Sequence, residues 1–219
     1  LDSQQFGDET TGRFFMRVHF DVPASQTIKA IRSQFDQIAQ KFAMDWGMWA
    51  VAAKPKLVLM VSKFGHCLND LLFRFKSGQF QIEIPAIISN HTDFALLVAS
   101  YGIPFYHLPV TPPTKTQQER QILQIIQQSQ ADLIVLARYM QILSSDLCLA
   151  LSGRAINIHH SFLPGFKGAK PYAQAHERGV KLIGATAHYV TSDLDEGPII
   201  EQDVARVDHS MDPSALAAL

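Results

Sequence analysis

Hydrophobic and polar positions follow two different patterns on either side of the stretch AAKPK at residues 52–56. Before it, Gly12–His19 (GRFFMRVH) is aromatic and branched, as strands are. Apolar residues then recur at spacings of three and four over 28–42, which predicts a helix with Ser25 as its N-cap. Met44–Val51 returns to strand-like composition. A strand, a helix and a strand within about forty residues predict the later part of a small α+β module.

Beyond AAKPK, short apolar runs alternate with longer mixed segments. The runs are Leu57–Val61, Ile82–Ile88, Leu133–Ala137, Ala155–Ile158 and Thr186–Val190. Helices are predicted at His66–Phe75, Asp93–Tyr101 and Thr116–Gln130, the last with Ile122, Ile125 and Ile126 facing inward. Such alternation predicts an α/β, Rossmann-like domain in which helices flank a parallel sheet. We place the boundary between residues 1–53 and 54–219, and we expect ligands at the carboxyl ends of the strands.

Composition narrows the class of protein. Hydrophobic residues make up 47% and charged residues 18%, which is typical of a folded globular chain. The net charge of -1 provides no broad positive field for nucleic acid or an anionic membrane. The apolar runs are far shorter than the roughly twenty residues of a membrane span. Cys67 and Cys148 show no paired spacing, so we expect a soluble protein in the reducing cytoplasm.

Several familiar sequence fingerprints are absent. The chain has neither the glycine-rich turn of dinucleotide-binding proteins nor the phosphate loop of nucleotide triphosphatases. It also lacks Cys-x-x-Cys and His-Glu-x-x-His. His159 and His160 are adjacent, but neighbouring side chains on a strand point to opposite sides. We therefore expect neither a bound cofactor nor a catalytic metal.

Candidate chemistry lies at the ends of two of the predicted strands. Asn157 and His159 share one face of an extended strand, so an amide and an imidazole project together. Asp195 precedes Glu196-Gly197-Pro198, a sequence that turns the chain. Taken singly, each residue also suits a structural role. Together they suit acyl chemistry, in which an oxygen gains negative charge and a nucleophile loses a proton.

These motifs carry a family resemblance. The matching segments are Asn157-Ile158-His159, Ser161-x-Leu163-Pro164 and Leu194-Asp195-x-Gly197-Pro198. The combination resembles the folate-dependent formyltransferase fold family. More narrowly, the chain is similar to formyltetrahydrofolate deformylases, because His160 stands where the transferases usually have proline. The segments that add to this similarity are Ser62-Lys63-x-x-His66-Cys67-Leu68-x-Asp70-Leu71-Leu72, Gly168-Ala169-x-Pro171-Tyr172 and Gly184-Ala185-Thr186-Ala187-His188-Tyr189.

The resemblance implies hydrolysis of 10-formyltetrahydrofolate to formate and tetrahydrofolate. Asn157 and His159 would bind and polarise the formyl oxygen. Asp195 would position and deprotonate the attacking water, and His188 would lie beside its carboxylate. A buried histidine bonded to backbone is the alternative role for His188.

The resemblance also implies a set of substrate-binding residues. A pterin-binding segment would comprise Arg138, Tyr139, Met140, Gln141, Ile142 and Leu143, and further contacts would come from Val190, Thr191 and Asp193. Relatives often have arginine in place of Gln141, so a salt link to the folate glutamate does not carry over. The alternative is that Met140, Ile142 and Leu143 belong to the hydrophobic core.

Two other enzymes of the same fold differ in the acceptor of the formyl group. A glycinamide ribonucleotide transferase needs a phosphate cradle after the first catalytic strand, but Ser62–Cys67 contains a single glycine and bulky side chains. A tRNA formyltransferase needs a basic domain, and this chain is neutral. Water is the acceptor that fits.

The first residues resemble a regulatory module. Gly12-Arg13-Phe14-Phe15-Met16-Arg17 is similar to the later half of an ACT domain, a ferredoxin-like fold. The resemblance implies a partial ACT-like domain over 1–53, an amino-acid effector and a homo-oligomer. The start of that module and the C-terminal part of the catalytic domain would lie outside this sequence. The non-enzymatic alternative, an amino-acid sensor, would not require Asn157, His159 and Asp195 together.

Overall fold

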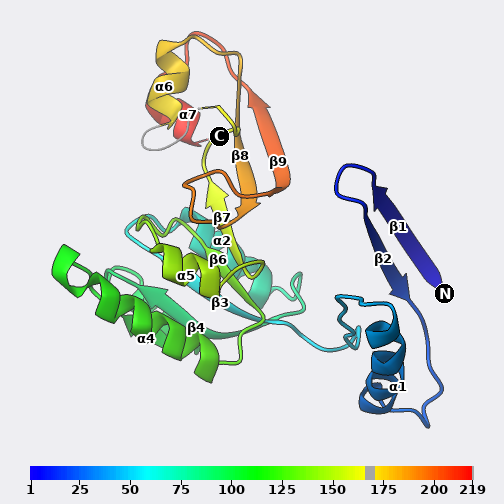
Figure 1. Ribbon diagram of the computed structural model, residues 1–219. Helices are drawn as coiled ribbons and strands as arrows, with labels where there is room; N and C mark the ends of the chain where they lie inside the picture. The colour runs from blue at the N-terminus through cyan, green and yellow to red at the C-terminus, as the bar shows by residue number, and fades with distance from the viewer. Residues whose placement is uncertain (166–170, 219) are drawn as a thin grey trace. The chain divides into compact units, whose positions relative to one another are not determined.

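The computed structural model describes residues 1–165 and 171–218, which form two compact units that divide between Ala53 and Lys54 (Figure 1). The motif residues Gly168 and Ala169 lie outside the described residues.

The first unit contains two strands and one helix. Strands β1 (Asp2–Asp8) and β2 (Arg13–His19) form an antiparallel pair, and helix α1 spans Ile28–Lys41. The N-cap is Thr27, whose Oγ1 accepts the N–H of Ala30 at 3.3 Å, so the prediction of Ser25 as the cap is wrong. Strand β1 was not predicted, because its largely polar sequence DSQQFGD lacks the alternation of a half-buried strand.

The predicted strand at Met44–Val51 is also wrong, because this segment forms no regular structure. It folds back on α1 instead. The Arg32 guanidinium donates to the carbonyl of Met48, and the Trp46 ring packs edge-on against Phe35 with 4.9 Å between ring centroids. Aromatic side chains favour both strands and packing of this kind, so composition did not distinguish the two.

The second unit is built on a seven-stranded sheet in the order β5-β4-β3-β6-β7-β8-β9. The strands are β3 (Lys56–Val61), β4 (Glu83–Ser89), β5 (Phe105–His107), β6 (Leu133–Leu136), β7 (Ala155–His159), β8 (Leu182–Tyr189) and β9 (Ile199–Arg206). The strand pairs from β5 to β7 are parallel, whereas the pairs β7–β8 and β8–β9 are antiparallel. The Rossmann-like α/β architecture is confirmed, with a mixed rather than fully parallel sheet. Residues 186–189 of β8 alternate between buried and half-buried, as antiparallel strands commonly do.

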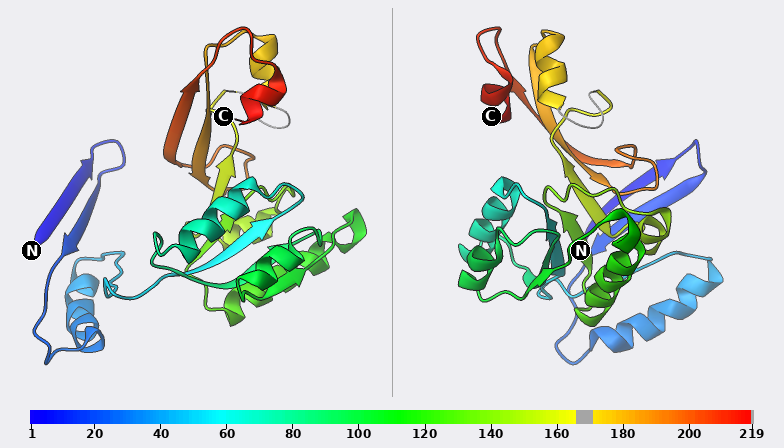
Figure 2. Two further views of the ribbon diagram at one scale, coloured as in Figure 1. Left: turned by 180° about the vertical axis from the view of Figure 1, so that it is seen from behind. Right: turned by 90° about the vertical axis from the view of Figure 1, so that its left-hand side faces the viewer.

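Helices cover both faces of the parallel part of the sheet. They are α2 (His66–Lys76), α3 (Ala95–Ser100), α4 (Lys115–Gln128, after the 3₁₀ turn Pro112–Thr114) and α5 (Ser145–Ala150). The views show α2 and α4 on opposite faces (Figure 2). Beyond them, α6 (Pro171–Glu177) and α7 (Pro213–Ala218) pack together near β8 and β9 around Ala175, Ile183 and Leu216.

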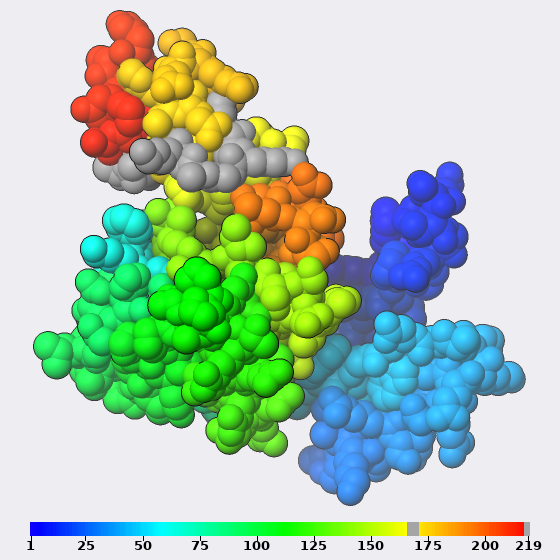
Figure 3. Space-filling model, turned by 60° about the vertical axis from the view of Figure 1, so that its left-hand side comes forward, coloured from blue at the N-terminus to red at the C-terminus, as the bar shows by residue number. Residues whose placement is uncertain are grey.

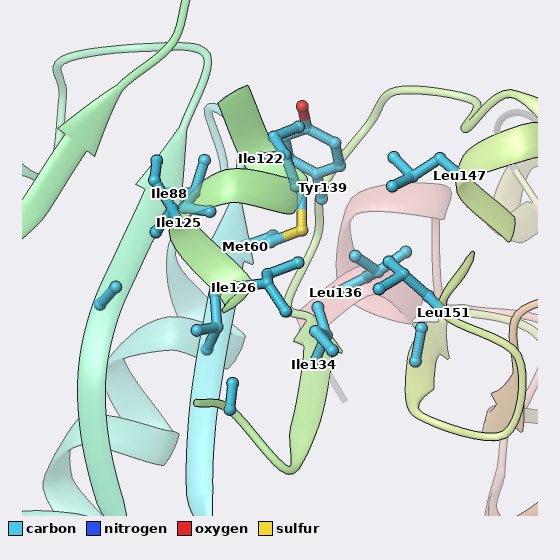
Figure 4. Packing of buried hydrophobic residues seen from close by; sticks show 14 residues of the cluster. Met60, Ile88, Ile122, Ile125, Ile126, Ile134, Leu136, Tyr139, Leu147 and Leu151 are labelled. Carbon is cyan, nitrogen blue, oxygen red and sulfur yellow. The ribbon is translucent and has the colours of Figure 1, made fainter. Parts of the chain in front are cut away.

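The core between the sheet and helices α4 and α5 is built mainly from branched aliphatic side chains (Figure 4). Its fully buried members include Met60, Ile88, Ile122, Ile126, Ile134, Leu147 and Leu151. Burial of each such side chain contributes about 1.5–3 kcal/mol. The inward orientation predicted for the three isoleucines of α4 is confirmed. This packing fixes the strands, and therefore the side chains at their carboxyl ends.

Candidate active site

The register between β7 and β8 brings four polar side chains to one face of the sheet. Asn157 lies opposite His188, and His159 lies opposite Thr186. Side chains alternate along each strand, so residues 157 and 159 of β7 and residues 186 and 188 of β8 point the same way. His159 and His188 are 6% and 2% exposed. The pairing of β7 with β8, rather than the spacing along the sequence, brings these side chains together.

The hydrogen bonds of His188 define its tautomer, that is, which ring nitrogen carries the proton. Its Nδ1 lies 2.9 Å from the carbonyl oxygen of Tyr189, which can only accept, so Nδ1 carries the proton. In the neutral ring Nε2 is then an acceptor, and it receives a hydrogen bond from Asn157 Nδ2 at 3.2 Å. His188 therefore orients the Asn157 amide.

Asp195 enters the same group from the loop that follows β8. Its Oδ1 lies 3.4 Å from His159 Nδ1 and 3.9 Å from His188 Nε2. The Asp195 side chain is 6% exposed, so water screens these interactions only weakly. Asp195 has a φ of 58°, a left-handed conformation that is uncommon for a residue other than glycine. The structure thus brings Asn157, His159, His188 and Asp195 together.

The loop carrying Asp195 is fastened at both ends. The N–H of Tyr189 donates to Pro198 O, and the N–H of Val190 donates to Ala155 O, each at 2.9 Å. Within the loop, Thr191 Oγ1 donates to Asp193 O at 3.0 Å. Figure 3 shows these orange residues against the yellow-green residues that precede β7. A cavity of about 250 Å³ borders the loop and is lined by Leu163, Pro164, Asp195, Glu196, Gly197 and Ile199.

Gly197 permits the close approach that places Asp195. A Cβ at this position would overlap the carbonyl oxygen of Tyr189 and lie 3.3 Å from Thr191 Cγ2. We expect Gly197→Ala to displace the loop, lower stability by about 1–3 kcal/mol, and reduce activity. Thermal unfolding followed by circular dichroism measures the first effect. Gly7→Ala is the control, because its Cβ would meet nothing within 4 Å. Equal melting temperatures for the wild type and Gly197→Ala would contradict this role.

Thr186 holds the turn after β7 and was not identified from the sequence. Its fully buried hydroxyl donates to Ser161 O at 2.7 Å and accepts from the Leu163 N–H and from Gln202 Nε2, both at 3.1 Å. Gln202 Nε2 also donates to Leu163 O at 2.9 Å. This network fixes the chain that leaves His159. The only signal for it is the cross-strand position of Thr186, which becomes visible once the register is known.

The predicted pterin-binding segment divides between core and surface. Tyr139 is 5% exposed and its hydroxyl accepts from Gln118 Nε2 at 2.8 Å, so this side chain belongs to the core. Met140 and Ile142 are 51% and 63% exposed, so the alternative that they are core residues is wrong. Leu143 does pack against the core. Gln141 is half-buried.

The segment after β3 is closely packed around the start of α2. Ser62 is 2% exposed, and its Oγ donates to Asn90 Oδ1 at 2.7 Å and accepts from the Met140 N–H at 2.9 Å. A Cβ on Gly65 would overlap the Phe94 ring. Burial lowers the pKa of His66, with a smaller effect from Arg138, and burial raises the pKa of the Cys67 thiol.

Among residues 1–165 and 171–218, no three histidine, cysteine or acidic side chains are grouped so that they could hold a metal ion. Within the same ranges, no helix has the length and apolar character needed to cross a membrane.

Comparison with known proteins places this geometry in a family. Residues 55–218 match the family model described as formyl transferase. A formyltetrahydrofolate deformylase from Corynebacterium sp. (strain P-1) is 53% identical over 219 residues, which are 100% of this chain and 77% of the relative. One from Bacillus subtilis is 45% identical, over 99% of this chain and 73% of the relative.

Solved structures agree with the sequence comparison. The crystal structure of a formyltetrahydrofolate deformylase from Burkholderia mallei is 56% identical, with a TM-score of 0.92 over 99% of this chain and 77% of that chain. The family model is that of the formyl transferases, and the relatives named above are formyltetrahydrofolate deformylases. The chain therefore belongs to the formyl transferase family and, within it, to the formyltetrahydrofolate deformylases.

Proposed function

We propose that this protein hydrolyses 10-formyltetrahydrofolate to formate and tetrahydrofolate. One observation carries the proposal. The buried carboxylate of Asp195 lies 3.4 Å from His159 Nδ1, beside an Asn157 amide that His188 orients, in a chain that matches deformylases over almost its whole length. A base and hydrogen-bond donors thus converge on one face of the sheet.

The first step is the attack of water on the formyl carbon. Asp195 accepts a proton from the water as its oxygen bonds to that carbon, which becomes tetrahedral. The former carbonyl oxygen gains a negative charge, and N–H donors of Asn157 and His159 stabilise it. Removing one donor of this kind typically costs about 100- to 1,000-fold in rate.

The second step breaks the bond between the formyl carbon and N10. The protonated Asp195 returns its proton to N10, which leaves as the amine of tetrahydrofolate. The formyl carbon keeps the oxygen and the second proton of the water and departs as formic acid, which loses that proton to solvent and becomes formate. Water is the only second reactant, and the three side chains supply the proton transfer and the charge stabilisation, so the reaction requires no cofactor or metal.

The substrate would reach this site across two partly exposed segments. The half-exposed side chains of Met140 and Ile142 offer apolar surface for the pterin, together with the backbone from Arg138 to Leu143. The loop residues Val190, Thr191 and Asp193 adjoin Asp195 and complete the proposed contacts. Gln141 is neutral, so any link to the folate glutamate at this position would be a hydrogen bond rather than a salt bridge.

An assay of formate and tetrahydrofolate tests the reaction. The protein is incubated with 10-formyltetrahydrofolate, with and without millimolar glycinamide ribonucleotide. We expect equal release of formate and tetrahydrofolate in both cases and no formylated nucleotide, because the segment after β3 carries the bulky Phe64, His66 and Leu68 and lacks the glycine-rich sequence of a phosphate cradle. Formylated nucleotide produced as fast as formate would identify a transferase instead.

We also propose that residues 1–53 are part of an ACT-like module that binds an amino acid, and that the protein is a cytoplasmic homo-oligomer. The isolated pair β1-β2 exposes Phe6, Phe14, Phe15 and Met16, each more than half exposed. Two strands with apolar side chains and open edges need a cover. The same assay with added glycine or methionine, and sedimentation at micromolar concentration, tests both points. A monomer indifferent to amino acids would contradict them.

A further inference from the structure

Arg138 is held in an unusual backbone conformation directly after β6. Its φ is 64°, in the left-handed region that disfavours side chains. The Arg138 carbonyl accepts the N–H of Ser62 at 3.1 Å, and Ser62 Oγ accepts the N–H of Met140 at 2.9 Å. Residues kept in such conformations by their surroundings concentrate at functional sites.

Two nitrogens of the half-buried Arg138 guanidinium have no hydrogen-bond partner among the described residues. Nε and Nη1 are shielded from solvent and make no hydrogen bond, and the ring of Phe64 lies 5.5 Å from Cζ. Among the described residues, no carboxylate forms an ion pair with Arg138. Buried charged donors without acceptors are costly, and an anion that accepts from them would remove that cost.

The groups around this guanidinium are uncharged at neutral pH. Burial, with smaller contributions from Arg138, His159 and His66, lowers the pKa of His160 to about 4. The pKa of His66 is also lowered, and burial raises the pKa values of Cys67 and Tyr172. The cluster of Arg138, His66, Cys67, His160 and Tyr172 therefore carries one positive charge, which matches a monoanion better than a dianion.

The cluster adjoins the place where the proposed reaction produces formate. The His160 ring lies 5.4 Å from the His159 ring and 5.7 Å from the Tyr172 ring, measured between centroids. Formate is a planar monoanion whose two oxygens suit a guanidinium, which recognises carboxylates in a bidentate manner. A product that leaves the formyl site past His160 would meet this charge next.

We propose that Arg138 binds the carboxylate of formate in a product site next to the formyl site. This rests on the proposed hydrolysis for its physiological ligand. The chemical requirement is only a small planar monoanion, so the site is testable without turnover.

Equilibrium binding of ¹³C-labelled formate, followed by NMR line broadening on the full chain, tests the site directly. We expect Arg138→Gln to weaken formate binding at least about tenfold, because a charge-assisted pair is lost. The matched control is Arg74→Gln, an exposed arginine on α2 that pairs with Asp70 at 2.8 Å, and it should bind like the wild type. Unchanged affinity in Arg138→Gln would overturn the proposal.

Wild-type measurements decide the question even where the variant does not fold. Nitrate, a planar monoanion, should compete with labelled formate. Phosphate should compete at least about tenfold less well, because the single positive charge of the cluster matches a monoanion better than a dianion. Formate should also shift the Nε–H signal of Arg138. Stronger competition by phosphate, or no shift of that signal, would overturn the proposal.

A kinetic arm separates this proposal from the proposed function. In a protein that hydrolyses 10-formyltetrahydrofolate, formate should inhibit as a product, and its inhibition constant should rise at least about tenfold in Arg138→Gln. A protein that binds formate through Arg138 but releases none from the folate would retain the site and refute the hydrolysis. Hydrolysis with unaltered formate inhibition in Arg138→Gln would support the proposed reaction and refute the formate site.

Discussion

Asp195→Asn is expected to fold and bind folate like the wild type while losing at least about 100-fold in the rate of formate release. The amide keeps the shape of the carboxylate, but it cannot accept the proton of the attacking water. Asp195 Oδ1 is also the atom that faces both His159 and His188, at 3.4 and 3.9 Å. Single-turnover release of formate measures the chemical step, and circular dichroism verifies the fold.

The control for Asp195→Asn is the same change at Asp146, an exposed residue in the first turn of α5. It removes one negative charge from the same unit without touching the site, so we expect activity close to that of the wild type. A rate in Asp195→Asn within about tenfold of the wild type would remove this residue from the role of base.

His159→Ala is expected to lower kcat by about 100- to 1,000-fold while KM changes by less than about threefold. A hydrogen bond that strengthens as the oxyanion forms stabilises the transition state more than the bound substrate. Steady-state kinetics on 10-formyltetrahydrofolate separate the two constants. His107→Ala, at the exposed end of β5, removes the same group elsewhere and should leave both constants unchanged.

The outcome that would contradict the role of His159 is a rise in KM with an unchanged kcat. It would make His159 a residue of uniform binding rather than of transition-state stabilisation. Asn157 would then be the remaining candidate for oxyanion stabilisation, because its amide is oriented independently through His188.

The strands and helices of the second unit followed from local patterns. Uninterrupted apolar runs such as LVLMV and LIVLA predicted buried strands, and the isoleucines of α4 predicted its inward face. The short β5 and the mostly exposed β9 have no such run, and both were missed. In the first unit, the aromatic residues of Met44–Val51 misled the prediction, because they pack on α1 instead of pairing as a strand.

The sequence alone identified the candidate site residues Asn157, His159 and Asp195, because they lie in motifs at or after the ends of apolar runs, where the strands of α/β sheets end. Only the tertiary structure decided how they meet. Strand β8 pairs antiparallel with β7, which puts His188 opposite Asn157. The close approach of Gly197 to Tyr189 places Asp195 beside His159. Likewise, only the structure shows that Nε and Nη1 of Arg138 are buried without a hydrogen-bond partner. Register and burial depend on contacts between segments far apart in the chain, and local propensity does not encode them.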